Sequence, residues 1–214
     1  TNCDAGSIYI KEGDCLRFSY AQNDTLQRQL LPGRKLPYST FSIPISNASI
    51  AGYVAANGAI LNIADVYEIK TSYPFFFNRS YDSITGYRTC SMLTIPLNNF
   101  RNEVIGVLQL INAMDSDGQA VPFAQDDEEI IIYFANNAAN AIERAKMTRE
   151  IILRMNKMAE MRDPKETGPH VNRVAAYSVT LYEAWAVKKG FPQEEIDKNR
   201  DVLRMSAMLH DVGK

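Results

Sequence analysis

Histidine is scarce in this 214-residue chain, and its distribution restricts the chemistry of the first half. Only two histidines occur, His170 and His210, and both lie in the last quarter of the sequence. Residues 1–125 therefore offer no imidazole for general acid–base catalysis. They also lack a glycine-rich phosphate loop and a carboxylate pair at working spacing, so we expect no catalytic centre there.

A dominant charge and long apolar runs are missing as well. The net charge of −2 creates no broad field that would favour a nucleic acid polymer or an acidic membrane surface. The apolar runs are too short to span a bilayer, and no secretory signal is present. The cysteines are odd in number and lack metal-site spacing, which indicates reduced thiols in a cytoplasmic protein. They are Cys3, Cys15 and Cys90.

Alternating apolar and polar residues predict two β-hairpins. Residues 7–10 and 16–20 flank a turn that contains Gly13. Residues 90–97 and 104–112 form two stronger strands that a polar loop joins. We therefore expect an antiparallel sheet with helical cover, which is an α+β fold.

Shorter elements are expected between the hairpins. Ser49 can cap a helix that ends at Gly58, and residues 60–63 would form a short strand. Residues 65–87 are irregular and rich in aromatic side chains. Within this segment, Asp82 is expected to cap one short helical turn.

One long helix of about 35 residues is predicted between residue 126 and Pro164, because the sequence there has no glycine or proline. Its apolar residues recur at spacings of three and four, and the first turns should pack on the sheet. The later turns carry a narrow apolar stripe among many charges, which fits a parallel coiled coil between two subunits. The alternative is a long helix that lies across its own domain.

Two more helices are predicted after a break at residues 164–169. The first runs from about residue 170 to 188 and the second from about 193 to 210. Pro169 is suited to the first position of a helix, with Thr167 or Gly168 as the cap.

The histidines of these helices stand in settings that suit metal binding. His210 and Asp211 end an apolar helical stretch, where both side chains could reach one ion, and this ligand pair suits iron, manganese, zinc or nickel. An aspartate can also bridge two ions about 3.5–4 Å apart, an arrangement suited to phosphate-ester hydrolysis. His170 lies in the first turn of its helix, with Glu166 just before it. Taken alone, each histidine could instead serve packing or a helix start.

The first part of the chain resembles a GAF domain. The similarity rests on the run VIGVLQLIN at residues 104–112 with the residues that follow it, and on DAGSIYI at residues 4–10. It covers about residues 1–145 and implies a small-molecule sensor whose usual first helix would precede residue 1. Some phosphodiesterase GAF domains carry an Asn-Lys, Phe, Asp-Glu signature. The matching residues here are Asn112, Phe123, Asp127 and Glu128, while Ala113 stands at the lysine position.

This resemblance implies a pocket between the sheet and residues 75–91. Asp82 and Arg88 are the polar side chains that we expect to contact a ligand, the alternative being that each is a solvated or capping residue. A second alternative is that the side chains of Phe75, Phe76 and Phe77 fill the pocket. The domain would then bind no ligand and serve only for dimerisation. Phe123 is expected in the core.

The last part of the chain resembles the HD-GYP family of metal-dependent phosphohydrolases. The similarity covers about residues 160–214 and rests on two elements, ETGPHVNRV at residues 166–174 and HDVGK at residues 210–214. It implies an all-helical domain that hydrolyses cyclic di-GMP with a pair of divalent transition metals, iron, manganese, zinc or nickel. The implied metal ligands are Glu166, His170, His210 and Asp211. Asp211 and Lys214 are the implied catalytic residues, with Lys214 neutralising a substrate phosphate.

Three parts are therefore expected: a sensor over residues 1–145, a connecting helix over 146–163 and the start of a hydrolase over 164–214. We expect a piece of a longer protein, because the Gly-Tyr-Pro element and further metal ligands of that family are not in this sequence. The longer protein would be a GAF-regulated cyclic di-GMP phosphodiesterase and a homodimer. The fragment alone would hold little or no metal and be inactive. The alternative is a ligand-binding or dimerising signalling module without catalytic activity.

Overall fold

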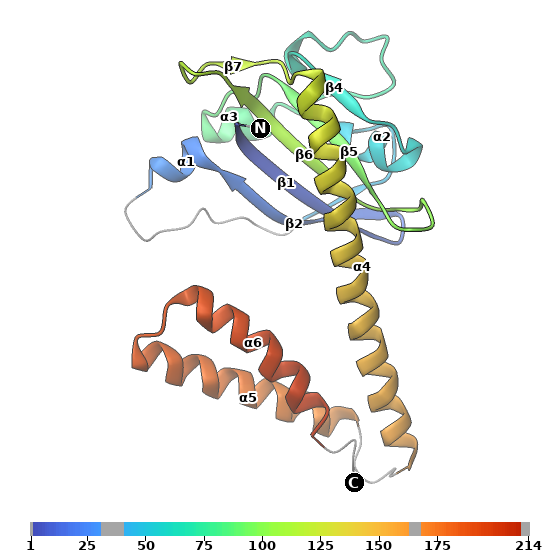
Figure 1. Ribbon diagram of the computed structural model, residues 1–214, viewed down its shortest axis with the longest axis vertical. Helices are drawn as coiled ribbons and strands as arrows, with labels where there is room; N and C mark the ends of the chain where they lie inside the picture. The colour runs from blue at the N-terminus through green and yellow to red at the C-terminus, as the bar shows by residue number, and fades with distance from the viewer. Residues whose placement is uncertain (1, 31–40, 163–167, 211–214) are drawn as a thin grey trace. The chain divides into compact units, whose positions relative to one another are not determined.

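A computed structural model of the chain describes residues 2–30, 41–162 and 168–210 (Figure 1). The structure divides into two compact units, Thr1–Glu143 and Arg144–Lys214. The first unit holds a sheet with helices, and the described part of the second is helical. The predicted α+β class is therefore confirmed. No helix among the described residues is long and apolar enough to cross a membrane.

The strands of the described residues form one antiparallel sheet. They are β1 (Cys3–Glu12), β2 (Cys15–Asn23), β3 (Ser42–Pro44), β4 (Leu61–Ile63), β5 (Met92–Asn98), β6 (Val104–Met114) and β7 (Ala120–Val121). Their order across the sheet is β3-β2-β1-β6-β5-β4, with β7 paired to β6. In the central pair, Ile8 of β1 lies opposite Leu108 of β6. Both predicted hairpins are confirmed, and the sequence reading missed β3 and β7.

The turn of each hairpin has a local cause. Between β1 and β2, Gly13 has a φ of 60°, the left-handed region that glycine adopts without a steric penalty. Between β5 and β6, the side-chain oxygen of Asn99 accepts hydrogen bonds of 2.9 Å from the backbone N–H groups of Arg101 and Glu103. Asn99 therefore sets the shape of the second turn.

Short helices connect the strands of the first unit. They are α1 (Asp24–Arg28), α2 (Ile50–Asn57), the 3-10 helix η1 (Val66–Glu68) and α3 (Ser80–Thr85). The Ser49 hydroxyl accepts from the Gly52 N–H at 3.0 Å, and Gly58 ends α2 with a φ of 65°, so this helix is as predicted. The predicted cap of α3 is wrong: Arg79 holds the N-cap position without a side-chain bond, because the Asp82 carboxylate is bonded elsewhere.

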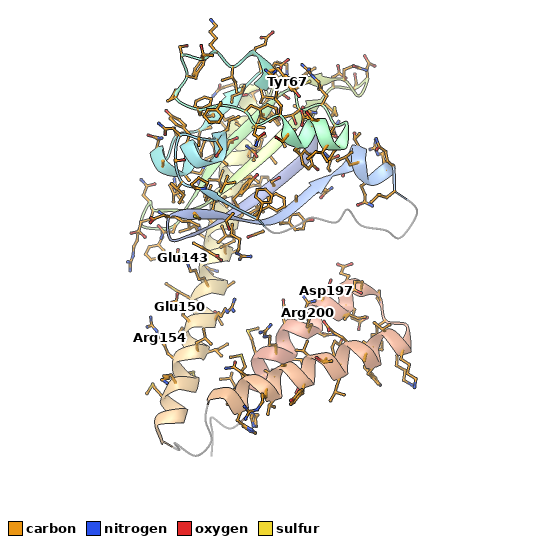
Figure 2. The ribbon with its side chains drawn as sticks, turned by 180° about the vertical axis from the view of Figure 1, so that it is seen from behind. Tyr67, Glu143, Glu150, Arg154, Asp197 and Arg200 are labelled. Atoms are coloured by element: carbon orange, nitrogen blue, oxygen red, sulfur yellow. The ribbon has the colours of Figure 1, made fainter. Side chains whose placement is uncertain are left out.

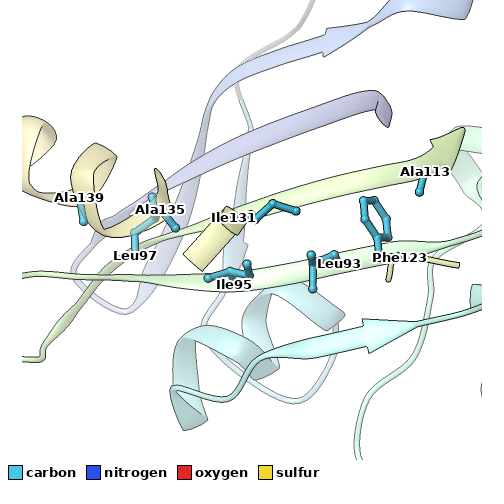
Figure 3. Close-up of a cluster of buried hydrophobic side chains, with 8 residues drawn as sticks. All are labelled: Leu93, Ile95, Leu97, Ala113, Phe123, Ile131, Ala135 and Ala139. Carbon is cyan, nitrogen blue, oxygen red and sulfur yellow. The ribbon is translucent and has the colours of Figure 1, made fainter. Parts of the chain in front are cut away.

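Helix α4 (Gln125–Arg162) has 38 residues and confirms the predicted long helix. Its first turns cover one face of the sheet through Ile131, Ala135 and Ala139 (Figure 3). These side chains pack against Leu93, Ile95 and Leu97 of β5, which are at most 2% exposed. The alanines let the helix approach the strands closely. The spacing predicts Ala138, not Ala139, in the apolar stripe. Ala139 is fully buried, so the contact face of the helix is wider than predicted.

The opposite face of the sheet is covered by α2 and by the segment after β4. Tyr9 of β1 and Val107 of β6 point to this face, because successive side chains of a strand alternate. They pack against Val54 of α2, which has no exposed surface. Farther along, Val66 and Phe75 are buried in a cluster with Ile50 and Met92. The sheet thus lies between two apolar layers.

The second unit contains a helical hairpin, α5 (Gly168–Lys189) and α6 (Gln193–Met208). The chain turns at Gly190, whose φ is 77°. Ala175, Ala186 and Ile196 are buried in this hairpin. Arg200, which Figure 2 labels on α6, forms an ion pair of 3.6 Å with Glu183 of α5. Both predicted helices are confirmed.

Candidate functional site

A chain of buried hydrogen bonds starts at Asn112, the first residue of the predicted signature. Its side-chain oxygen accepts from the Cys90 N–H at 2.7 Å, and its amide donates to the Arg88 carbonyl at 2.8 Å. The same amide donates to the Tyr87 hydroxyl at 3.0 Å. The φ of 55° at Asn112 is in the left-handed region, which asparagine tolerates better than most residues. Asn112 therefore fixes the entry of the chain into β5.

The Tyr87 hydroxyl carries this chain of bonds to β1. It donates to the Asp4 carboxylate at 2.7 Å, and Asp4 also accepts from the Thr25 hydroxyl at 2.9 Å. Burial, and secondly the hydrogen bond to Asp4, raise the pKa of Tyr87 above its ordinary value. Tyr87 stays protonated and donates, so the link between β1 and the segment before β5 is maintained at neutral pH.

Asp82, one of the predicted ligand-contact residues, lies in α3 with its carboxylate turned inward. It is 7% exposed and accepts from the Thr89 N–H and the Thr89 hydroxyl, each at 2.8 Å. Its second oxygen also accepts from the Tyr67 hydroxyl at 2.9 Å. The carboxylate thus ties α3 to η1 and to the segment that leads into β5.

Arg88, the other predicted contact residue, lies at the surface beside Tyr67. Its guanidinium is 4.1 Å from the centre of the Tyr67 ring and 3.3 Å from the Asp65 carboxylate. The guanidinium of Arg79 also lies over this ring, 4.5 Å from its centre. The hydrogen bond to Asp82 raises the pKa of Tyr67. Two guanidinium groups therefore lie against the Tyr67 ring on the outer side of residues 65–91, and the Asp65 carboxylate lies beside one of them. Charged groups at this surface are accessible to a ligand.

A second polar group faces α2 from the middle of the sheet. The side-chain amide of Gln109 donates to the Thr94 hydroxyl at 3.4 Å, and its oxygen accepts from the Tyr9 hydroxyl at 3.5 Å. All three residues are at most 8% exposed, and burial raises the pKa of Tyr9 to about 12. The sequence reading missed these residues, because each stands singly in a strand and only the pairing of β1, β6 and β5 brings them together.

The three phenylalanines expected to fill an empty pocket lie in different environments. Phe75 is buried and lies 4.9 Å from the Tyr53 ring. Phe77 is half-buried against Tyr67, with ring centres 5.6 Å apart. Phe76 is 60% exposed and fills nothing. The proposed filling by all three residues is therefore wrong for Phe76, whose side chain points to solvent.

Three further residues at the signature positions have structural contacts. Phe123 is buried in the cluster under α4, as predicted (Figure 3). Glu128 accepts from the Asn62 side-chain amide at 3.3 Å. Ala113 is buried in the same cluster as Phe123, so the ion pair that a lysine would make at this position is absent.

The two histidines meet in the second unit. His170 lies in the first turn of α5, and His210 follows α6. Their ring centres are 5.7 Å apart, because the helical hairpin returns the chain to its starting point. Two imidazoles bound to one ion at about 2.0–2.1 Å have ring centres no more than about 6.5 Å apart. Their separation therefore suits one shared ion or two neighbouring ions.

The other predicted residues of this site, Glu166, Asp211 and Lys214, lie outside the described residues. Within residues 2–30, 41–162 and 168–210, no three side chains of histidine, cysteine, aspartate or glutamate gather as a metal site. Of the four predicted ligands, the described residues include only His170 and His210. The Nδ1 atom of His210 lies 2.8 Å from the Ala207 carbonyl, which orients this ring at the end of α6.

An antiparallel sheet with a long helix on one face and short helices on the other is the architecture of a class of signalling and ligand-binding modules. The chain belongs to the GAF domain family, which matches residues 1–142. It is similar to the dual 3',5'-cyclic-AMP and -GMP phosphodiesterase 11A of Takifugu rubripes, with 37% identity over 98 residues. That match covers 46% of this chain and 10% of the phosphodiesterase, so the chain spans about a tenth of that relative's length.

Two solved structures are similar to this chain at low sequence identity. The GAF domain of a phosphoenolpyruvate-protein phosphotransferase from Coxiella burnetii is 18% identical with a TM-score of 0.49, over 69% of this chain and 76% of that chain. Residues 122 to 287 of a methyl-accepting chemotaxis protein are 21% identical with a TM-score of 0.49, over 68% of this chain and 81% of that chain.

Proposed function

We propose that this chain is the sensor and the beginning of the catalytic part of a metal-dependent phosphodiesterase that acts on cyclic di-GMP. The observation that carries the proposal is the approach of His170 and His210, whose ring centres are 5.7 Å apart. The only two histidines of the sequence meet although 40 positions separate them. Each stands in a motif that resembles a metal-binding element of the HD-GYP family. The membership in the GAF family supports the sensory role of residues 1–142.

In this proposal, Glu166, His170, His210 and Asp211 bind part of a pair of divalent transition metals, with iron, manganese, zinc or nickel as candidates. When bound, the metals supply a water of lowered pKa for attack on the phosphodiester. Lys214 neutralises a phosphate of the substrate. The remaining ligands would come from parts of the longer protein, so the chain alone would bind metal weakly and be inactive.

Cobalt binding tests the metal site in the chain itself. Co²⁺ added to the protein should give the visible absorption of an imidazole-ligated ion, and His170→Ala combined with His210→Ala should abolish it. Asn199→Ala, an exposed change in α6, serves as the matched control and should leave the spectrum unchanged. An identical cobalt spectrum in the double histidine variant would contradict the proposed site.

For the first unit, we propose regulation by a small molecule that contacts the outer side of residues 65–91. Arg88 is 58% exposed in its side chain and carries a positive charge beside Tyr67, so the ligand is expected to be anionic. A ligand can regulate only if it binds two arrangements of the protein with different affinity. Calorimetry with cyclic AMP and cyclic GMP should detect binding that Arg88→Ala weakens. Equal binding by the variant would exclude Arg88 as a contact.

We also propose that the protein is a homodimer through the later turns of α4. Met147, Ile151, Met155 and Met158 recur at spacings of four, four and three, and each is at least 42% exposed. Uncovered apolar stripes with this spacing pair in coiled coils. Ile151→Glu should convert a dimer into a monomer in sedimentation velocity, whereas Arg149→Glu, an exposed charge change in the same helix, should not.

The free thiols of all three cysteines fit a cytoplasmic location.

A second candidate function is a ligand-binding or dimerising signalling module without catalysis. Its dimerising form is favoured by the first unit, where the candidate contacts Asp82 and Arg88 form bonds within residues 65–91. The two functions differ in the outcome of one comparison. A longer protein that holds its metals and still fails to cleave cyclic di-GMP would favour the second.

A further inference from the structure

A groove of about 410 Å³ runs along the side of α4 in the first unit. Its walls are α4, the last residues of β5, the turn between β5 and β6, and Gly58 and Ile60 between α2 and β4. Five asparagines line it, and none of the described lining residues is charged. They are Asn98, Asn99, Asn102, Asn136 and Asn140. This volume lies within the range of about 300–1,000 Å³ that is typical of binding pockets.

The turn that forms one wall is held rigidly. Asn99 is 8% exposed, and its side-chain amide donates to the carboxylates of Glu103 and Glu143 at 3.0 Å each. The bond to Glu143 joins the turn to α4. The position of the wall is therefore set before any ligand arrives, which lowers the entropic cost of binding.

Two further carboxamides of the groove are exposed, and a third has a buried oxygen. Asn98 Oδ1 is buried, yet it has no hydrogen-bond partner in the described part of the chain. This oxygen has almost no accessible surface, so the exposed carboxamides of Asn136 and Asn140 are the ones that can contact a ligand. Asn136 and Asn140 are exposed, and neither side chain forms a hydrogen bond with another described residue. Each of these two can donate and accept.

We propose that this groove binds an extended, uncharged polypeptide segment through its backbone. Asn136 and Asn140 are separated by four residues of α4, which corresponds to about 6.0 Å along the helix axis. Peptide groups that point the same way in an extended chain repeat every two residues, or about 6.6 Å. The two carboxamides can therefore each pair with one peptide group on the same side of such a segment.

The surroundings favour neutral, apolar side chains on that segment. Ile95 and Ile132 line the groove, and Phe100 at its rim is 66% exposed. None of the described lining residues carries a charge that would pair with a charged side chain of the segment. The lining part of α4, from Ile132 to Asn140, extends about 12 Å, which corresponds to about four residues of an extended chain.

A titration monitored by NMR tests this assignment. The probe is a pool of acetylated and amidated pentapeptides built from alanine, leucine, serine, threonine and valine. Added to the ¹⁵N-labelled chain, it should shift the side-chain amide signals of Asn98, Asn136 and Asn140. Asn136→Ala with Asn140→Ala should weaken binding roughly tenfold or more, because two hydrogen bonds are lost. Asn137→Ala, an exposed change beside them that does not line the groove, is the matched control.

Pentapeptides with N-methylated backbones distinguish backbone recognition from apolar adhesion. They should not shift the groove signals, since they cannot donate their amide hydrogens. Equal shifts with N-methylated peptides, or unchanged binding by the double asparagine variant, would overturn the proposal. So would the absence of any shift. Movement of the same signals on raising the protein concentration alone would also overturn it, by showing that a second copy of the chain occupies the groove.

Discussion

Replacing Asp82 by alanine should destabilise the first unit through the hydrogen bonds that the carboxylate accepts. Thr89 is 2% exposed, so its N–H and hydroxyl would lose their partner in a place that water does not reach. A buried polar group left without a partner costs about 1–3 kcal/mol. The Tyr67 hydroxyl is less enclosed and can turn to water. The two Thr89 donors together therefore give an expected loss of about 3 kcal/mol in the free energy of unfolding.

The assay must separate the two units. Trp185 is the only tryptophan and lies in α5, so its fluorescence in urea reports the second unit. Amide hydrogen exchange of β5 and β6 reports the first unit. Asp82→Ala should raise exchange in these strands and leave the Trp185 transition in place.

Asp117 provides the control, because its side chain is exposed in the turn before β7. Asp117→Ala should change the stability by less than about 0.5 kcal/mol. If Asp82→Ala and Asp117→Ala had the same exchange rates in β5 and β6, the carboxylate would not hold this part of the fold. The reasoning about residues 65–91 would then be refuted.

Three further predictions concern the sheet. Burial raises the pKa of Tyr9 to about 12, so its contribution to stability is complete below the unfolded value of about 10 and is lost as the pH rises towards 12. Between pH 10 and 12, the free energy of unfolding measured in urea should therefore decrease with pH less steeply in Tyr9→Phe, by up to about 1.4 kcal/mol per pH unit. The same slope in the variant and the original protein would contradict this assignment. Leu93→Ala should cost about 2–5 kcal/mol, because Leu93 is fully buried under α4, and a cost in urea unfolding below about 1 kcal/mol would contradict the packing. Gly106→Ala should destabilise by about 1–3 kcal/mol, since a Cβ would meet the Tyr9 carbonyl of the neighbouring strand, and an unchanged melting temperature would exclude that clash.

The elements that the sequence predicts well have local signals. Ser49 and Gly58 mark the two ends of α2. The Ser49 side chain accepts a backbone N–H in the first turn, and Gly58 adopts the left-handed conformation that ends the helix. The long helix α4 follows from an uninterrupted apolar spacing, which is also a local property. These signals need no knowledge of the tertiary structure.

The polar contacts of the first unit depend on residues far apart in the sequence. Tyr87 and Asp4 are 83 positions apart, and no local pattern indicates that they meet. Asp82 resembles a helix cap by its position in the sequence, yet Thr89 and Tyr67 offer it buried donors that a cap would not have. The open groove beside α4 is likewise invisible in the sequence, because its asparagines come from a helix, a strand end and a turn.

The histidine pair combines a signal that is visible in the sequence with a contact that only the fold creates. Resemblance to a known family predicts that His170 and His210 belong together, and the helical hairpin brings their rings to 5.7 Å. Neither histidine alone indicates a metal site. The distance follows from the lengths of α5 and α6, which are 22 and 16 residues and return the chain to the start of α5.

Turnover of cyclic di-GMP by the proposed phosphodiesterase, which would contain this chain, is the most direct measurement of the proposed activity. With Mn²⁺ or Fe²⁺ bound, the protein should release the linear dinucleotide. His170→Ala and His210→Ala should each lower kcat by at least about a hundredfold through loss of metal ligands, and Asn199→Ala should leave it unchanged. Full turnover by either histidine variant, or none by the metal-loaded protein, would contradict the assignment.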